Sequence, residues 1–337
     1  MITFPSLCYL WIGCILFLLE VQCSKNPAKP VDPVTKDVTC IVSDKSKLEL
    51  ISILPADNPL NLDITLAPVD TRSAAILKLI GTPGIHPDFG SGLYSGVPMG
   101  IPFILVCKDQ TKELILFRGN SYDADYSSES DPGPYPIPLS APIEGNGGGD
   151  SHVLAVDVDN LKLYELYNAS NGSNGWEASG GVIWDLKING QRPAGWSSAD
   201  ASGMPILPLL VRYEEILKGK IDHAIRFTLS KPKTMIAYTA PASHWSAGIN
   251  TDANSPTPYG MRLRLKANFD ISTYSQTNQV ILTAFKKYGL IFADIGSDFF
   301  ISGAPDDRWN NDDLSQLKKI TAANFEVVQM GTIVKRN

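Results

Sequence analysis

Cysteine, histidine and positive charge are scarce in this chain of 337 residues. It contains five Cys and four His, and its 29 Lys and Arg are outnumbered by 35 Asp and Glu. Proteins that bind nucleic acid through phosphate contacts usually have the opposite charge balance, so the composition argues against a nucleic-acid partner. The scarcity of Cys and His also argues against a structural zinc site.

Several catalytic signatures are missing as well. The sequence contains no nucleophile elbow G-x-S-x-G, no H-E-x-x-H, no C-x-x-C and no G-x-x-x-x-G-K. The Gly-rich run at 145–149 does not lie between a strand and a helix, as a dinucleotide site requires. These absences remove several enzyme classes without excluding catalysis.

Long apolar runs are limited to the start of the chain. Residues 7–19 are mostly apolar, but the run is shorter than the roughly 20 residues of a membrane-spanning helix. We therefore predict a signal peptide over 1–23, a flexible N-terminal segment over 24–36 and a single β-rich extracellular domain over 37–335. No Lys or Arg precedes the run, so an uncleaved anchor is the alternative. We expect the protein to be secreted, with no stable membrane span.

The remaining cysteines fit an oxidising compartment. Removal of the signal peptide takes away three of the five, and leaves Cys40 and Cys107. An even pair in a secreted protein predicts one disulfide, and two buried free thiols are the alternative. Asn168 and Asn171 each begin an N-x-S triplet, which predicts N-glycosylation if the host is a eukaryote.

Many short alternating runs indicate a β-rich fold. The clearest unit is 151–167, where two such runs are joined by the turn residues Asp159 and Asn160. Helical spacing is expected over 70–81, 207–217, 277–288 and 312–320. We predict a β-rich α+β fold with an antiparallel β-sandwich or jelly-roll-like core and helices at its margins.

The expected hairpin places an acid and an imidazole on one face. With the turn at Asp159 and Asn160, paired residues share a face. That face carries Val156, Leu163, Leu154, Glu165, His152 and Tyr167. Burial on an apolar face raises the pKa of a Glu, which suits a general acid, and His223 leads a similar apolar face. The alternative is that Glu165 pairs with an Arg and both His are ordinary core residues.

Aromatic residues suggest a sugar-binding surface. Trp176, Trp184 and Trp196 lie within a short stretch that also contains Arg192. Exposed indole rings beside hydrogen-bonding groups provide a platform for a sugar ring, so Trp176, Trp196 and Arg192 are candidate ligand-binding residues. The alternative is that Trp184 and Trp196 belong to the core.

Acidic loops are candidates for calcium. Asp123, Asp125 and Glu129 form one group, and a second lies between Asp306 and Asp313. Neither matches the EF-hand loop, so solvated loops or helix caps are the alternative. The spacings His86-Pro-Asp88 and Asp150-Ser-His152 could orient a metal or a proton relay, but a lone His-x-Asp is a weak signal.

Several segments after Asp150 resemble a family of secreted, mostly bacterial proteins without an assigned activity. The resemblance rests on the segments GWSSADASGMPILPLLVRYEE, RLRLKANFDIS and SGAPDDRW. It implies one continuous domain in which GWSSAD and SGAPDDRW belong to a characteristic surface. It transfers no catalytic role.

The residues favour a secreted, glycan-directed protein, with glycoside hydrolysis by a carboxylate pair as the first hypothesis. Glu165 is the expected acid, Asp200 or Asp157 its partner, and His152 and His223 the supporting residues. The second hypothesis is a non-catalytic carbohydrate-binding or extracellular-matrix protein that takes up calcium. The third is a metal-dependent enzyme that uses His86, His152 or His223.

Overall fold

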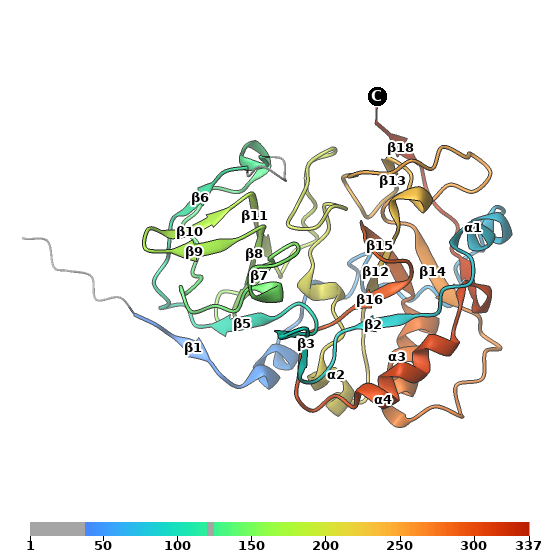
Figure 1. Cartoon of the computed structure of the whole chain (residues 1–337), viewed down its shortest axis with the longest axis horizontal. Helices are drawn as coiled ribbons and strands as arrows, with labels where there is room; N and C mark the ends of the chain where they lie inside the picture. Colours follow the sequence, from blue (N-terminus) through green and yellow to red (C-terminus); the bar gives the residue numbers. More distant parts are fainter. Residues whose placement is uncertain (1–37, 120–124, 337) are drawn as a thin grey trace, which may run out of the picture. The chain divides into compact units, whose positions relative to one another are not determined.

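The computed structural model describes residues 38–119 and 125–336 (Figure 1). The predicted signal peptide and N-terminal segment lie outside these residues, and so does Asp123 of the first acidic loop. The described chain is rich in strands, which form several mixed and antiparallel sheets, none of them closed. The sandwich arrangement stays a prediction.

Five strands form the first sheet, in the order β1-β5-β7-β8-β11. They are β1 (Ile41–Val42), β5 (Phe103–Val106), β7 (Val153–Asp157), β8 (Lys162–Tyr167) and β11 (Gly180–Asp185). β7 and β8 make the predicted hairpin, with Val156 opposite Leu163 and Leu154 opposite Glu165. The predicted register is therefore confirmed.

The first sheet buries both of its faces. One face, which includes Leu154, Val156 and Leu163, belongs to the larger apolar core. The other face, with Val153 and Leu166, packs into a smaller core. Double burial explains why the strands of the hairpin are apolar at nearly every position.

A small sheet of three strands contributes to the smaller core. It contains β6 (Ile115–Phe117), β10 (Gly175–Ala178) and β9 (Ser170–Gly172), in that order. Two further pairs join β3 (Leu93–Tyr94) to β4 (Val97–Pro98) and β13 (Ala237–Tyr238) to β18 (Val334–Lys335).

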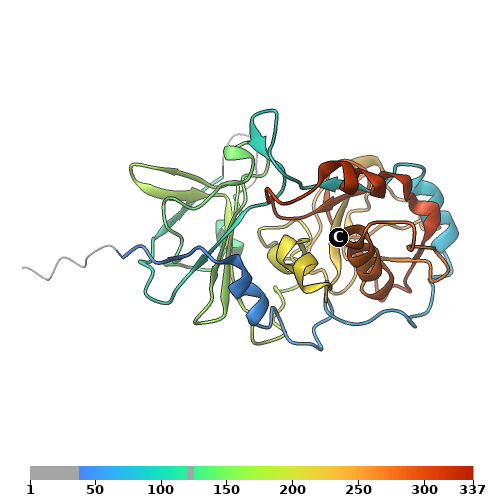
Figure 2. The ribbon, with the colours of Figure 1, turned by 90° about the horizontal axis from the view of Figure 1, so that it is seen from below.

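Six strands form the second large sheet, in the order β17-β14-β15-β12-β16-β2. They are β2 (His86–Asp88), β12 (Ile225–Leu229), β14 (Arg262–Leu265), β15 (Leu290–Ile295), β16 (Phe300–Ser302) and β17 (Phe325–Val327). Figure 1 shows α1 and α3 beside this sheet, and α3 packs against β14 while α1 packs against β17. Figure 2 shows the same sheet and helices from below.

The α-helices of the described chain are α1 (Ser73–Ile80), α2 (Tyr213–Lys218), α3 (Gln276–Lys287) and α4 (Asn311–Leu314). Short 3-10 segments include η3 (Glu144–Asn146), η4 (Leu207–Leu209) and η6 (Ser315–Lys319). The predicted helix 207–217 is divided into η4 and α2. The division occurs because Val211 between them bridges to Gly303 as extended chain.

Parallel pairing is the main departure from the expected fold. β5 pairs with β7, β12 with β15, β6 with β10 and β2 with β16, all in parallel. The expected antiparallel core is therefore only partly correct, because these pairings make the sheets that contain them mixed. The partners are joined by long connections, such as the one from β12 to β15 that contains α3, and such connections allow a strand to return in the same direction.

The disulfide prediction is confirmed. Cys40 and Cys107 are bonded, with their Cα atoms 5.6 Å apart. The bond lies beside the antiparallel pair β1 and β5, where Ile41 is opposite Val106. It therefore ties the N-terminal edge strand to the first sheet. No helix in the described residues has the length and apolarity needed to cross a bilayer.

Candidate functional site

A β-bulge creates the most unusual polar cluster in the structure. β12 and β15 run parallel with Phe227 opposite Phe292, but the next pair joins Thr228 to Asp294. The extra residue, Ala293, shifts the alternation of β15 by one position. Because strand side chains alternate between faces, the shift places Asp294 on the same face as Arg226 instead of the opposite one.

The Arg226 guanidinium holds the cluster together. Its Nε and Nη2 atoms donate to Asp200 at 2.8 and 3.2 Å, and Nη2 also donates to Asp294 at 2.9 Å. Its Nη1 atom donates to the Ser302 hydroxyl at 2.9 Å. Arg226 is buried, so these charged partners replace the water that its guanidinium loses.

His152 contributes a second buried cation. Its Nδ1 atom lies 2.5 Å from the Glu144 carboxylate, and its Nε2 atom lies 3.0 Å from the carbonyl oxygen of Ala199. Both partners are acceptors, so both ring nitrogens carry protons. Burial by itself lowers the pKa of His152, but the Glu144 carboxylate outweighs it and raises that pKa to about 9.

We call this cluster the polar centre. Its members are Glu144, His152, Asp200, Arg226, Asp294 and Ser302. Arg226, Asp294 and Ser302 lie on the second large sheet, His152 directly precedes β7 of the first, and the others lie outside the strands. The strand face that carries Arg226 therefore meets the end of the β7–β8 hairpin at this centre.

Asp294 is the partly exposed carboxyl group of the polar centre whose pKa is raised. Its side chain keeps 13 % of its surface exposed. Burial and the Asp200 charge raise its pKa to about 8, although Arg226 acts in the opposite direction. The carboxyl of Asp294 is thus protonated near neutral pH.

Two further carboxylates, Asp88 and Asp150, lie at the rim of the polar centre. Both residues are exposed. The charge of Asp150 acts on His152, Arg226 and Asp294. Surrounding atoms and the charge of Glu144 raise the pKa of Asp88. The centre and its rim together hold five carboxyl groups around two cations.

A row of aromatic rings leads from the polar centre to the surface. It passes through His152, Tyr167, Tyr126, His244 and Trp245, with ring centroids 5.8, 6.2, 6.5 and 5.9 Å apart in turn. After His152 the rings are half-exposed. We call this feature the aromatic row.

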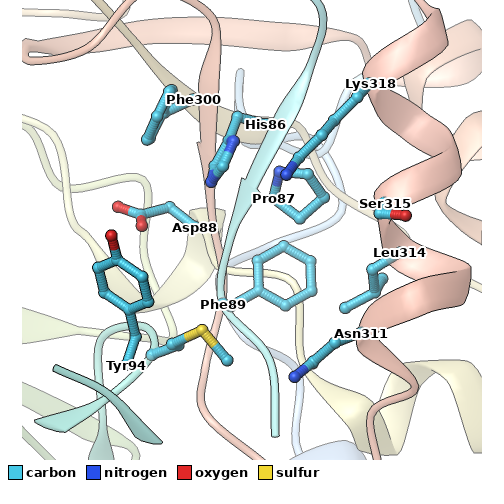
Figure 3. A pocket seen from close by; sticks show the side chains of 11 residues that line it. His86, Pro87, Asp88, Phe89, Tyr94, Phe300, Asn311, Leu314, Ser315 and Lys318 are labelled. Atoms are coloured by element: carbon cyan, nitrogen blue, oxygen red, sulfur yellow. The ribbon is translucent and has the colours of Figure 1, made fainter. Parts of the chain in front are cut away.

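Asp88 also faces a pocket of about 510 Å³, shown in Figure 3. The pocket lies between β2, the β3–β4 hairpin and the helical segment formed by α4 and η6. His86, Tyr94 and Lys318 point into it (Figure 3).

Glu165, the predicted acid, is fully buried. Its carboxylate accepts hydrogen bonds from the indole N–H of Trp184 and the backbone N–H groups of Ile206 and Leu207, each at 2.9 Å. Burial raises its pKa to about 7, the direction that its apolar face predicts. The side chain has no exposed surface, so it cannot reach a substrate. The expectation that Glu165 and His152 share one accessible pocket is therefore wrong, because Glu165 is enclosed by the protein.

The other predicted carboxylates also have internal partners. Asp157 accepts hydrogen bonds from the backbone N–H groups of Asp159 and Asn160 and from the Asn160 amide, so it stabilises the hairpin turn. This bonding corrects its expected role as a catalytic partner. Asp200 belongs to the polar centre, but its side chain is fully buried against Arg226.

The predicted imidazoles separate. His152 lies in the polar centre, whereas His223 contacts Glu215 at 2.8 Å and the carbonyl oxygen of Ala224 at 2.7 Å. His223 precedes β12, and its partners Glu215 and Ala224 are not members of the polar centre. The expectation that both His support one site is wrong.

Of the two tryptophans predicted to bind a sugar, only Trp196 has an exposed ring. Trp176 is 1 % exposed and donates its indole N–H to Ile137, so it is a core residue and not a sugar platform. Trp196 is 36 % exposed, and the Arg192 guanidinium lies 5.4 Å from its ring centre. Arg192 also forms an ion pair with Asp131.

The glycosylation and calcium predictions are untested, but their residues have defined partners. Asn168 donates to the Ser179 hydroxyl, and Asn171 donates to the carbonyl oxygen of Leu139. In the second acidic loop, Asp306 pairs with Arg308 and Asp313 accepts from Ser275. Within 38–119 and 125–336, no group of three or more His, Cys, Asp or Glu side chains could hold a metal ion.

No protein-family model, no curated protein and no solved structure matches the chain. The family resemblance therefore stays a prediction. Both of its surface segments nevertheless contribute to the polar centre: GWSSAD supplies Asp200 and the Ala199 carbonyl, and SGAPDDRW supplies Ser302. Asp200 and Ser302 are buried, so the segments meet below the surface.

Sequence reasoning missed Arg226 and Asp294. Each is a charged residue inside an otherwise apolar strand, in HAIRFTL and LIFADI respectively. An isolated charge in a buried strand needs a partner of opposite charge. The presence of one such charge in each strand could have indicated that Arg226 and Asp294 pair with each other. The bulge that brings Asp294 to the face of Arg226 has no mark in the sequence.

Proposed function

We propose that this chain is a secreted, glycan-directed hydrolase that uses the polar centre for general acid–base catalysis. The substrate class is a polysaccharide or glycan chain that lies along the aromatic row. Asp294 is the proton donor, and the exposed Asp150 at the rim is the proton acceptor. This proposal keeps the predicted chemistry and moves it from Glu165 to Asp294.

The proposal rests on one observation: carboxyl groups outnumber cations in and around the polar centre. Five carboxyl groups share the field of Arg226 and His152. Like charges at short distance cannot all ionise, so a proton is retained among them near neutral pH. Glycosidic cleavage needs this combination of one protonated and one ionised carboxyl group.

Each proposed role follows from exposure and partners. Asp294, protonated and partly exposed, would give its proton to the glycosidic oxygen as the bond to the anomeric carbon breaks. Asp150 is exposed, and its charge acts on Asp294. It would accept a proton from the water that attacks the anomeric carbon. Arg226 is a positioning residue because it holds Asp294 by a hydrogen bond, and the charges of Asp200 and His152 act on the pKa of Asp294.

The aromatic row supports a glycan as the ligand. Aromatic faces pack against the C–H faces of sugar rings, and a row of rings provides contacts for consecutive units. Trp196 and Arg192 offer a second candidate platform. The disulfide Cys40–Cys107 supports an oxidising compartment, which agrees with secretion.

The test uses Asp294→Asn on a panel of xylan, mixed-linkage β-glucan, chitosan, polygalacturonate and alginate, with release of reducing ends as the readout. We expect at least a 100-fold loss of turnover on the polysaccharide that the native chain cleaves, because the proton donor is removed. The matched control is Asp109→Asn, at an exposed Asp outside the polar centre.

Unchanged turnover by Asp294→Asn would contradict the assigned acid. A native chain that binds polysaccharide without releasing reducing ends would instead favour the non-catalytic alternative. The aromatic row favours that alternative equally, because stacking does not depend on catalysis.

A further inference from the structure

The pocket in Figure 3 gathers polar side chains that lack partners. Within the described residues, the side chains of His86, Asp88, Tyr94 and Lys318 form no hydrogen bond and no ion pair. This contrasts with the polar centre, where every charged group contacts another. Polar groups that converge without internal partners are available to a ligand.

Three structural elements bring these groups together, and Tyr94 is contributed by β3. His86 and Asp88 are two residues apart on β2, so they share a face of the strand. Lys318 comes from η6 on the other side of the pocket. Lys318 is close enough to act on His86, because burial and the Lys318 charge together lower the pKa of that imidazole. His86 is therefore neutral near pH 7 and offers one donor and one acceptor.

Apolar surface fills the space between the polar groups. Phe89, Met99 and Leu314 line the pocket, and the Phe300 ring stacks on His86 with centroids 4.0 Å apart. The pocket volume of about 510 Å³ lies within the usual range for a small-molecule site. An occupant thus needs an apolar face together with polar substituents at its edge.

We infer that this pocket binds the carboxylate-bearing ring of an acidic sugar, a uronic acid unit. Lys318 receives the carboxylate, Asp88 and Tyr94 receive hydroxyl groups, and the apolar surface contacts the ring. The inference rests on the proposed function and deepens it, because Asp88 connects the pocket to the polar centre. The chain would then act on acidic rather than neutral glycans.

Charge complementarity decides between a neutral and an acidic ring. Lys318 is the cation of this pocket and has no carboxylate partner in the described residues. A neutral sugar would leave its ammonium group without a counter-charge, whereas a carboxylate supplies one. The Asp88 carboxylate needs a donor in turn, which sugar hydroxyls provide and a plain aromatic acid does not.

The test compares Lys318→Gln with Lys319→Gln in the full chain. Lys319 is the next residue of η6, is exposed and lies outside this pocket. Calorimetry measures binding of trigalacturonate, of its carboxyl-reduced neutral analogue and of benzoate. We expect Lys318→Gln to weaken trigalacturonate binding at least ten-fold and to leave the affinity for the neutral analogue unchanged. Lys319→Gln should change neither affinity.

Four outcomes would overturn the inference. They are an unchanged trigalacturonate affinity in Lys318→Gln, a native affinity for the neutral analogue equal to that for trigalacturonate, benzoate binding as tight as that of trigalacturonate, and no binding of trigalacturonate by the native chain. Asp294→Asn leaves this pocket intact, so its turnover reports on the proposed function separately from these affinities.

Discussion

Glu165 and Asp294 are two carboxyl groups whose pKa rises for the same reason, yet their surroundings differ. Burial raises both pKa values, to about 7 and about 8. Glu165 is enclosed and accepts three N–H groups, whereas Asp294 keeps exposed surface and shares one guanidinium with Asp200. A raised pKa therefore does not identify a working acid. Access to solvent and excess charge among its neighbours distinguish the two sites.

Removal of Arg226 should have the largest effect on the free energy of unfolding. It disrupts the site of Asp294 and leaves the site of Glu165 intact. Arg226→Met leaves the fully buried Asp200 without a counter-charge and removes a hydrogen bond to Asp294, which costs about 4 kcal/mol of unfolding free energy. Urea denaturation at pH 7 measures the loss. Arg118→Gln at an exposed ion pair is the control, with a loss below about 1 kcal/mol. Similar losses in the two variants would contradict this account.

His152 should make stability fall at alkaline pH. Its folded pKa of about 9 exceeds the unfolded value of 6.5, so its stabilisation is complete below pH 6.5 and lost as pH rises to about 9. Relative to His152→Asn, the native chain should lose about 3 kcal/mol across this window. Denaturation curves at several pH values provide the measurement, and parallel pH profiles of the two proteins would refute the assignment.

Glu165 should act in a lower pH window. Its folded pKa of about 7 lies above the model value of 4.5, so the protonated form favours folding and stability falls between pH 4.5 and about 7. Relative to Glu165→Gln, the native chain should lose about 3 kcal/mol there. If the loss of stability caused by Glu165 occurred at alkaline pH instead, Glu165 and His152 would no longer be distinguished by pH.

The aromatic row should have the smallest effect. Trp245→Ala removes one half-exposed ring and should weaken polysaccharide binding about five-fold, or roughly 1 kcal/mol. Trp196→Ala tests the platform predicted from the sequence. Affinity electrophoresis in gels that contain the polysaccharide compares the two variants. A loss confined to Trp196→Ala would place the ligand away from the polar centre.

Local patterns predicted much of this fold. The hairpin register followed from a two-residue turn between alternating runs, and α3 followed from its apolar spacing and the glycine after its end. Parallel pairing was not predictable in this way, because it depends on how long connections return. The first helix illustrates a smaller limit: it was expected over 70–81, but α1 begins at Ser73, and the Asp70 carboxylate holds the Arg72 side chain.

The site was less predictable than the fold. Alternation placed Glu165 and His152 on one face, but it did not show that Trp184 and two backbone N–H groups would satisfy Glu165. Asp294 reached its face through a bulge, and its partner Arg226 lies on another strand. Such contacts arise between distant segments, so single-sequence periodicity does not contain them.

The pH dependence of kcat/KM on the cleaved polysaccharide tests the central claim most directly. If Asp294 is the acid, activity should fall above about pH 8 in the native chain and in Glu165→Gln, because the donor loses its proton. Residual activity in Asp294→Asn should lack this alkaline limb. An alkaline limb that is retained in Asp294→Asn and shifted in Glu165→Gln would contradict the account.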